Sequence, residues 1–476
     1  MLRRAVVACL LAVWAVAVAG CGENDASTVN PLTPTLSSEG RGSPTAASTT
    51  TNASPSPAQA AATATPATPT SSTAAKRLGS PSGVPHSVRA PDFRAATGAT
   101  AKFGQLGGAA YRIEVPADWN GSLVLFAHGI RLTGAEVFVS NPPEPLRQAF
   151  LRGGYAWAAS SYSENFYVPG IGADDTLALL DFFAKEVGAP RHVYLVGESM
   201  GGHITTLLLE QFPDRFDGAL AVCGAVAGQE QIDFLVSWLA IAEAVTGMTA
   251  PLEQGQAAVA GMLLQSLPAA LGSPPNLTPA GQQFASAIQA LTGGPRAYFA
   301  EGLALQLQPN FGLFLLDPKR ERLASAAATN ADVAYAIDPA FGLAASDLNA
   351  KARRFAADPA KRNAAGHPGA VPTTGKIATP LLTLHNTGDL FVPISQEQSY
   401  RRKVEAAGAG QLLVQRAIRA AGHCQFSDQE LTQAWADLVG WVEAGKKPAG
   451  DDLLGDLFEA GIAFTQPTRN AAGKLP

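Results

Sequence analysis

The chain has 476 residues, of which 47% are hydrophobic, so it is long enough to form a large globular domain. It carries 34 Lys and Arg against 39 Asp and Glu, a formal net charge of −5 at pH 7, and has no long basic run. This mildly acidic balance argues against nucleic acid as a partner.

The first 21 residues have the pattern of an export signal. Arg3 and Arg4 precede an apolar run over residues 5–19, which is shorter than the roughly 20 residues of a membrane-spanning helix. The run ends in Val-Ala-Gly-Cys at residues 18–21, which resembles the lipobox of bacterial lipoproteins. That resemblance implies acylation of Cys21 and a lipid anchor in a bacterial membrane, on its periplasmic or cell-surface side. An ordinary secretory signal cleaved nearby is the alternative.

A segment rich in Ser, Thr, Pro and Ala follows over residues 22–85. It contains few large apolar residues and therefore cannot build a core. We expect a disordered tether that holds a folded domain, residues 86–476, away from the membrane surface.

The first half of the folded part alternates strands and helices. Residues 122–127 form an unbroken apolar run, which is typical of a strand covered on both faces of a parallel sheet. The expected strands cover residues 109–115, 122–127, 155–160, 192–196 and 218–222, and the expected helices lie within residues 144–152, over residues 174–187 and directly after Ser199.

This alternation stops between about residues 224 and 378. The segment predicts helices over residues 232–245, 256–267, 281–291 and 297–307, and its most hydrophobic stretch is residues 310–316. We interpret it as a helical cap inserted into the domain.

The alternation then resumes to the end of the domain. Strands are expected at residues 379–385 and 411–418, with helices at residues 395–407, starting from Ser395 as N-cap, and 428–444, and a peripheral tail after Gly445. The whole pattern predicts an α/β fold: a doubly wound, mostly parallel sheet whose ligands gather at the carboxyl ends of the strands.

A nucleophile motif lies between the strand at residues 192–196 and the helix that follows it. Gly197-Glu198-Ser199-Met200-Gly201 fits G-x-S-x-G, in which a serine on a sharp turn needs small neighbours because the chain approaches it closely. Ser199 is therefore the candidate nucleophile.

A serine hydroxyl needs a base, and the base needs a third group that fixes its tautomer. Asp389 follows the strand after the cap and His423 follows the last strand, so the chain order is Ser, Asp, His. His385, at the end of a strand, is the alternative base, although a structural role suits it better. Glu198 is expected to pack or to place charge rather than to react.

Two backbone amides are expected to bind the oxyanion. One belongs to Met200, at the helix N-terminus, and the other to Ile130, in the loop after the strand at residues 122–127. In that loop Gly129 would allow close approach, and His128 would brace the chain.

Four cysteines are present, of which Cys9 would leave with the signal and Cys21 would carry lipid. Cys223 and Cys424 remain in the folded part, and in an exported protein they suggest one disulfide, with two separate buried thiols as the alternative.

Together, the His128-Gly129 loop, the residue 197–201 motif, Gly388-Asp389 and Gly422-His423 resemble the α/β-hydrolase superfamily with a helical cap. Cys424 beside His423 is also similar to the histidine-flanking cysteine of tannase and feruloyl-esterase-like enzymes. In those enzymes the partner cysteine adjoins the serine, where this chain has Glu198. The resemblance implies a serine hydrolase, with Ser199, His423 and Asp389 acting together.

The expected activity is cleavage of carboxylic esters, on a small-molecule or polymer substrate, with no metal or organic cofactor. An amidase or peptidase with the same machinery is the nearest alternative, and a non-catalytic binding lipoprotein is a more distant one.

Overall fold

The computed structural model describes residues 78–79, 86–89, 92–131, 136–254, 256–307, 316–317, 322–323, 327–362 and 371–466. The signal, Cys21 and almost all of the predicted tether lie outside these residues, as does nearly all of the hydrophobic stretch at residues 310–316. In the part of the chain that is described, no helix is both long and apolar enough to cross a membrane.

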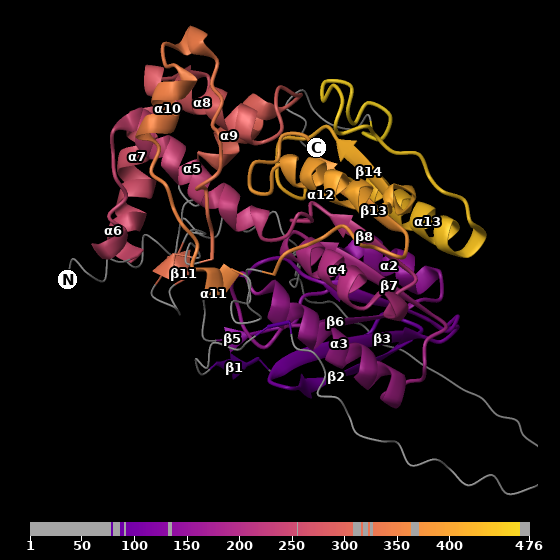
Figure 1. Cartoon of the computed structure of the whole chain (residues 1–476). Helices are drawn as coiled ribbons and strands as arrows, with labels where there is room; N and C mark the ends of the chain where they lie inside the picture. The colour runs from indigo at the N-terminus through magenta and orange to yellow at the C-terminus, as the bar shows by residue number, and fades with distance from the viewer. Residues whose placement is uncertain are drawn as a thin grey trace, which may run out of the picture. The chain divides into compact units, whose positions relative to one another are not determined.

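One eight-stranded sheet organises the domain, in the order β14-β13-β8-β7-β4-β6-β3-β2 (Figure 1). The six strands from β14 to β6 are parallel, while β3 runs antiparallel to both β6 and β2. The strands are β2 Ala99–Leu106, β3 Ala109–Pro116, β4 Ser122–Ala127, β6 Ala156–Ser160, β7 His192–Glu198, β8 Gly218–Val222, β13 Leu381–Asn386 and β14 Leu413–Ile418. This strand order confirms the predicted α/β-hydrolase fold class.

Helices cover both faces of the sheet. Neighbouring residues on a strand point to opposite faces, so Leu125 of β4 joins one core while Val124 joins the other. The first core is shared with α3 Pro169–Glu186, α4 Met200–Gln211 and α12 Ser395–Ala406, and the second with α2 Glu144–Arg152 and α13 Asp428–Ala444. Because both faces are covered, every residue of β4, β8 and β13 is buried, which explains the almost entirely apolar sequences of β4 and β8.

The segment between β8 and β13 forms a helical cap with a core of its own, in which Trp238, Leu239, Phe284 and Leu303 are buried. Figure 1 shows α5, α8 and α10 of this cap together. Its helices are α5 Glu230–Thr246, α6 Gln256–Gly261, α7 Leu267–Leu271, α8 Pro279–Leu291, α9 Phe299–Gln306, α10 Ala345–Lys351 and α11 Pro359–Arg362. The helix expected over residues 256–267 is broken by a π-helical turn at Met262–Ser266 and continues as α7.

Short elements complete the fold. They are the strand pairs β1 Ser87–Val88 with β5 Glu136–Val137, β9 Gly272–Ser273 with β10 Asn276–Leu277, and β11 Leu316–Asp317 with β12 Arg322–Leu323, and the 3-10 turns Pro213–Arg215, Leu252–Gln254, Pro339–Phe341 and Gly410–Leu412.

The N-terminal side of the domain differs from the sequence expectation. The edge strand β2 precedes the first strand that we expected, and α3 begins at Pro169 rather than at residue 174. Leu78 and Gly79, which fall in the predicted tether, pack here: their backbone amides donate to the Asp174 carboxylate at 2.9 and 3.0 Å. Asp174 therefore binds an incoming chain segment instead of starting the helix.

Two expectations at the C-terminal side were wrong. Ser395 is the first residue of α12, and the N-cap is Ile394, which makes no side-chain cap bond. The tail after Gly445 is not peripheral, because Leu453 and Leu457 are buried beside Ala417 of β14. Asp451 also pairs with this strand, accepting from the Ala417 amide at 2.7 Å. The tail thus covers the outer edge of the sheet, which would otherwise expose unpaired backbone groups.

Candidate active site

Ser199 occupies a sharp turn between β7 and α4, with φ 57° and ψ −116°. A non-glycine residue in this backbone region costs about 1–3 kcal/mol, so the surroundings must hold it there. The Ser199 amide donates to the Val222 carbonyl at 3.0 Å, and the Ser199 carbonyl accepts from the Ala225 amide at 3.1 Å. The last residue of β8 and the loop that follows it therefore hold the backbone of Ser199 through both its amide and its carbonyl.

The two glycines of the motif lie in tight contact with other backbone. A Cβ on Gly197 would lie 2.1 Å from the Gly201 carbonyl oxygen, and one on Gly201 would lie 1.8 Å from the Ala127 carbonyl oxygen. No side chain fits at either position without moving the strand. This is the close approach that the sequence motif predicts.

The structure brings Ser199, His423 and Asp389 together at the carboxyl ends of the strands. The His423 Nε2 to Ser199 Oγ distance is 2.9 Å, and the His423 Nδ1 to Asp389 Oδ2 distance is 2.6 Å. An ionised carboxylate can only accept, so Nδ1 donates to Asp389 and leaves Nε2 to accept the serine hydroxyl proton. The Asp389 side chain is fully buried, whereas that of His423 is 17% exposed.

Backbone donors hold the second carboxylate oxygen of Asp389. Its Oδ1 accepts from the Phe391 amide at 2.8 Å and from the Val392 amide at 3.1 Å. Together with the bond to His423, these contacts fix the orientation of the carboxylate.

The turn that carries Asp389 is wedged between the cap and the histidine loop. A Cβ on Gly302 of α9 would lie 1.8 Å from the Gly388 carbonyl oxygen, and a Cβ on Gly388 would lie 2.7 Å from the Cα of Ala421. From the cap, Gln306 Nε2 also donates to the Leu390 carbonyl at 2.6 Å. Sequence reasoning missed Gly302 and Gln306, because nothing in a helical pattern says which residue meets a distant turn.

Arg296 is a third cap residue at this turn that the sequence did not reveal. Its guanidinium is buried, and Nε donates to the Thr387 carbonyl at 2.6 Å. Burial lowers the pKa of Arg296 to about 9, while the nearby negative charge of Asp389 acts in the opposite direction. In the sequence, Arg296 is a single basic residue between apolar helices, and this pattern does not indicate a role.

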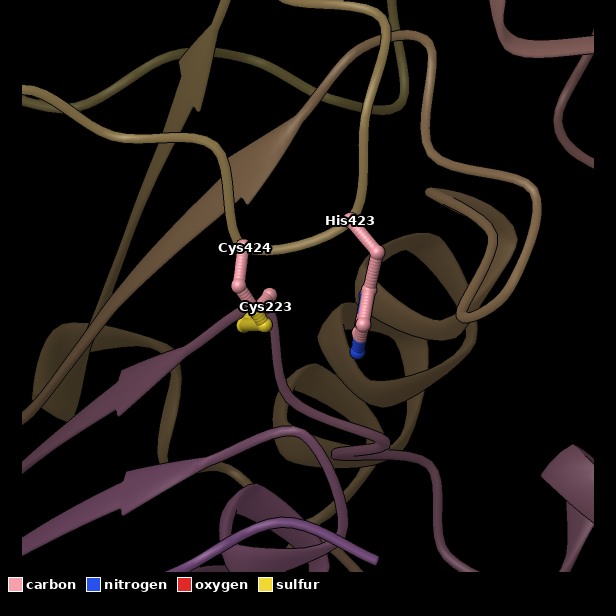
Figure 2. A group of neighbouring side chains, drawn as sticks. All are labelled: Cys223, His423 and Cys424. Atoms are coloured by element: carbon pink, nitrogen blue, oxygen red, sulfur yellow. A yellow bond between two sulfur atoms is a disulfide. The ribbon is translucent and has the colours of Figure 1, made fainter. Parts of the chain in front are cut away.

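A disulfide ties the histidine loop to the end of β8. The Cα atoms of Cys223 and Cys424 are 5.1 Å apart, and their sulfurs are bonded. Figure 2 shows Cys424 joined to Cys223, with His423 directly beside it on the loop. Asn386 supports the same loop, since Nδ2 donates to the Gln425 carbonyl at 3.0 Å and Oδ1 accepts from the Gln425 amide at 2.8 Å.

The ligand atoms of Cys223, His423 and Cys424 lie within 4.8 Å of one another. These residues do not fit a metal site, because cysteine binds metal as a thiolate and both sulfurs are in the disulfide.

The loop expected to complete an oxyanion site lies against the nucleophile. A Cβ on Gly129 would lie 3.1 Å from the Cβ of Ser199, so the chain from His128 to Ile130 passes directly beside it. Met200 is the first residue of α4, and its amide therefore has no acceptor within the helix.

His128 braces this loop. Its Nδ1 donates to the Gly129 carbonyl at 2.7 Å, and its ring stacks on that of Tyr162 with centroids 4.0 Å apart. Burial, followed by the charge of Arg131, lowers the pKa of His128 to about 3, so the ring is neutral at pH 7.

Two other residues, His385 and Glu198, were considered for acid–base roles from the sequence. His385 is fully buried, and its Nε2 donates to the Val392 carbonyl at 2.7 Å, so it is not the base beside Ser199. Burial raises the pKa of the Glu198 carboxyl, and His423 partly offsets this effect.

The strand order and this Ser–His–Asp arrangement define a protein of the α/β-hydrolase fold class. No family model matches the chain. Among curated proteins it is similar to an o-phthalyl amidase from Xanthobacter agilis, with 23% identity over 450 residues, covering 80% of this chain and 95% of that protein.

Two solved structures illustrate the distant similarity to enzymes of known structure. Est1E from Butyrivibrio proteoclasticus has a TM-score of 0.36 at 13% identity, covering 72% of this chain and 99% of that one. An acylaminoacyl peptidase from Pyrococcus horikoshii has a TM-score of 0.38 at 10% identity, covering 75% of this chain and 44% of that one.

Proposed function

We propose that the chain is a serine hydrolase that cleaves carboxylic esters through an acyl-enzyme intermediate. The observation that carries this proposal is the continuous hydrogen-bonded path from Ser199 Oγ through His423 to Asp389, at 2.9 and 2.6 Å. Each atom in that path has the donor or acceptor role that the chemistry requires.

In the proposed reaction Ser199 Oγ attacks the acyl carbon while His423 Nε2 takes its proton. Asp389 keeps the imidazole in the required tautomer and stabilises the imidazolium that forms. The amides of Met200 and Ile130 would bind the oxyanion, and His423 would return the proton to the leaving alcohol. A water molecule activated by the same imidazole then releases the acid and restores Ser199.

Amide hydrolysis is the second candidate. It is favoured by the similarity to an o-phthalyl amidase, which extends over 80% of this chain. The acylation chemistry is the same for both bonds, and only the leaving group differs, because an amine must be protonated as it departs. A peptidase fits the site less well. A non-catalytic binding protein also fits less well, because binding alone does not require a complete Ser–His–Asp hydrogen-bonded path.

The test compares purified wild type with Ser199→Ala on nitrophenyl esters of increasing acyl length, on the matched anilides and on an o-phthalyl amide. Serine-dependent ester cleavage with slower amide cleavage supports an esterase, and the preferred acyl length reports the size of the acyl site. Faster amide cleavage assigns the second candidate. Equal rates for wild type and Ser199→Ala on all substrates would overturn both.

We also propose that Cys21 carries a lipid anchor that attaches the exported protein to a bacterial membrane. The motif at residues 18–21 supports this proposal. Metabolic labelling with a radioactive fatty acid should label the wild type but not Cys21→Ser, and labelling that persists in the variant would exclude the anchor.

A further inference from the structure

A second histidine–carboxylate pair lies buried beneath the active site. His385, in β13, and Glu397, in α12, both have fully buried side chains, and His385 Nδ1 is 3.3 Å from Glu397 Oε1. Their contact is an ion pair by distance, and neither atom has a hydrogen-bond partner among the described residues.

The contacts of this pair require a proton between its members. The Val392 carbonyl can only accept, so His385 Nε2 carries a hydrogen. If His385 were neutral and Glu397 ionised, the lone pair of Nδ1 would face a carboxylate oxygen, and two buried acceptors would remain unsatisfied. A proton on Nδ1 replaces the facing lone pairs by an attraction between opposite charges 3.3 Å apart.

The surroundings of Glu397 place that proton on the imidazole. Its Oε2 accepts from Thr383 Oγ1 at 2.7 Å and from Gln415 Nε2 at 2.5 Å, so both of these neighbours donate to the carboxylate. Burial by itself lowers the pKa of His385, but the contacts with Glu397, Asp389 and the Val392 carbonyl outweigh it, and the net shift is upward.

This pair lies next to Asp389, the carboxylate that orients His423 in the proposed mechanism, since His385 Nε2 is 3.9 Å from Asp389 Oδ2. We infer that His385 is a permanent imidazolium, held by Glu397, and that it is a positioning residue: its positive charge keeps the buried Asp389 ionised and oriented toward His423. This role rests on the proposed function, because it assigns Asp389 to the reaction.

The charged groups around Asp389 therefore alternate in sign. Glu397 is negative, His385 positive and Asp389 negative, and Asp389 faces His423; from the cap, Arg296 adds a positive charge near Asp389. If the charge of His385 is removed, the attraction of Asp389 for the His423 proton is less opposed, so the pKa of His423 rises. Loss of the negative charge of Glu397 by itself lowers the pKa of His423. Glu397 is farther from His423, so this effect is the smaller one.

Glu397→Gln tests the charge while keeping the contacts. The amide oxygen can accept from Thr383 and Gln415, and the amide nitrogen can donate to the unprotonated Nδ1 of a neutral His385. Glu405→Gln is the matched control, because Glu405 lies on the same helix and is half-exposed, in an ion pair with Arg401.

The experiment is a nitrogen NMR titration of histidine side chains in the full chain, with His385 assigned from His385→Gln and His423 from His423→Gln. At pH 8, above the ordinary histidine pKa of about 6.5, His385 should still be protonated on both nitrogens in wild type and in Glu405→Gln, but not in Glu397→Gln. The pKa of His423 should be measurably higher in Glu397→Gln than in wild type and Glu405→Gln.

A neutral His385 at pH 8 in wild type would overturn the inference, as would an unchanged His423 pKa in Glu397→Gln. Neither measurement needs turnover. If the shifts appear and the protein cleaves no substrate, the proposed function fails while the charge arrangement stands. If it does turn over, the acid limb of kcat/KM should move upward with the pKa of His423.

Discussion

Gly302 in the cap and Gly388 in the turn before Asp389 are in direct backbone contact, so close that a Cβ on Gly302 would lie 1.8 Å from the Gly388 carbonyl oxygen. A glycine inside a helix costs about 0.5–1 kcal/mol relative to alanine, so its presence in α9 needs a reason. The reason is this contact, which places the cap against the turn that orients the proposed acid.

We predict that Gly302→Ala lowers kcat/KM strongly while the protein remains folded. The added methyl group must displace the turn, and a misplacement of about 1 Å can cost about 10²-fold in rate. Gly440→Ala in α13 is the control, because a Cβ there meets no atom within 4 Å. Steady-state kinetics and thermal melting of both variants provide the check, and equal kinetics for the two would contradict the assigned contact.

Asp389→Asn should lower kcat by about 10⁴-fold with little change in the fold. The asparagine oxygen can still accept from the Phe391 and Val392 amides, but its NH₂ group would face His423 Nδ1. The histidine would then adopt the tautomer with a hydrogen on Nε2, which cannot take the serine proton. Single-turnover kinetics with a chromogenic substrate measure the loss, and a decrease below about tenfold would exclude the assigned role of Asp389.

Removal of the disulfide should affect both stability and turnover. The bond between Cys223 and Cys424 closes a loop of 201 residues, and loss of a native disulfide costs about 2–5 kcal/mol. In Cys223→Ala/Cys424→Ala the histidine loop also loses its attachment to β8, so we expect kcat to fall. Urea unfolding and kinetics are measured together, with reduced wild type alongside; an unchanged kcat in both would show that the bond stabilises the fold without positioning His423.

Acid should destabilise the protein through buried neutral histidines. Burial lowers the pKa of His128 to about 3 and that of His203 to about 4, below the 6.5 of an exposed imidazole. Between those values and pH 6.5 the unfolded chain binds protons that the folded chain does not. The free energy of unfolding therefore falls as the pH falls, by up to about 1.4 kcal/mol per pH unit for each histidine.

His203, one turn into α4 from Ser199, allows the acid effect of a buried histidine outside the Ser–His–Asp path to be measured. Its Nε2 donates to the Val371 carbonyl at 2.8 Å, and its Nδ1 accepts from the Tyr167 hydroxyl at 3.0 Å. Urea unfolding of His203→Gln at several pH values should show a shallower loss below pH 6.5 than wild type. His86→Gln, at a half-exposed histidine, should keep the wild-type slope, and identical slopes for both variants would contradict the prediction.

The buried strands were predictable because burial on both faces of the sheet restricts their residues to apolar types. β4 and β8 match the expected bounds, since a strand covered on both faces must be apolar throughout. The edge strand β2 was missed because its residues alternate between half-buried and exposed, so polar side chains interrupt the pattern. Pro169, the start of α3, lay outside the expected helix because the residues around it carry no apolar period.

The sequence predicted the site residues that belong to a recognisable motif or follow a predicted strand. It did not predict the residues that reach the site only through tertiary packing. Ser199, Asp389 and His423 each follow a predicted strand, and parallel strands bring their carboxyl ends together. Arg296 and Gln306 contact the turn that carries Asp389, at the Thr387 and Leu390 carbonyls, only because the cap packs against this turn, and no local pattern encodes that packing. His385 was expected to be structural, and its pairing with Glu397 depends on how α12 packs against β13.

The disulfide also closes a covalent ring that contains the cap together with β13, α12 and β14. Its two cysteines lie on either side of the inserted segment, so a single cut between residues 224 and 423 divides the chain without separating the pieces. A protease that nicks the cap would yield one band on a non-reducing gel and two on a reducing gel. The nucleophile and the histidine would stay on one covalently joined molecule, although they would belong to different polypeptides.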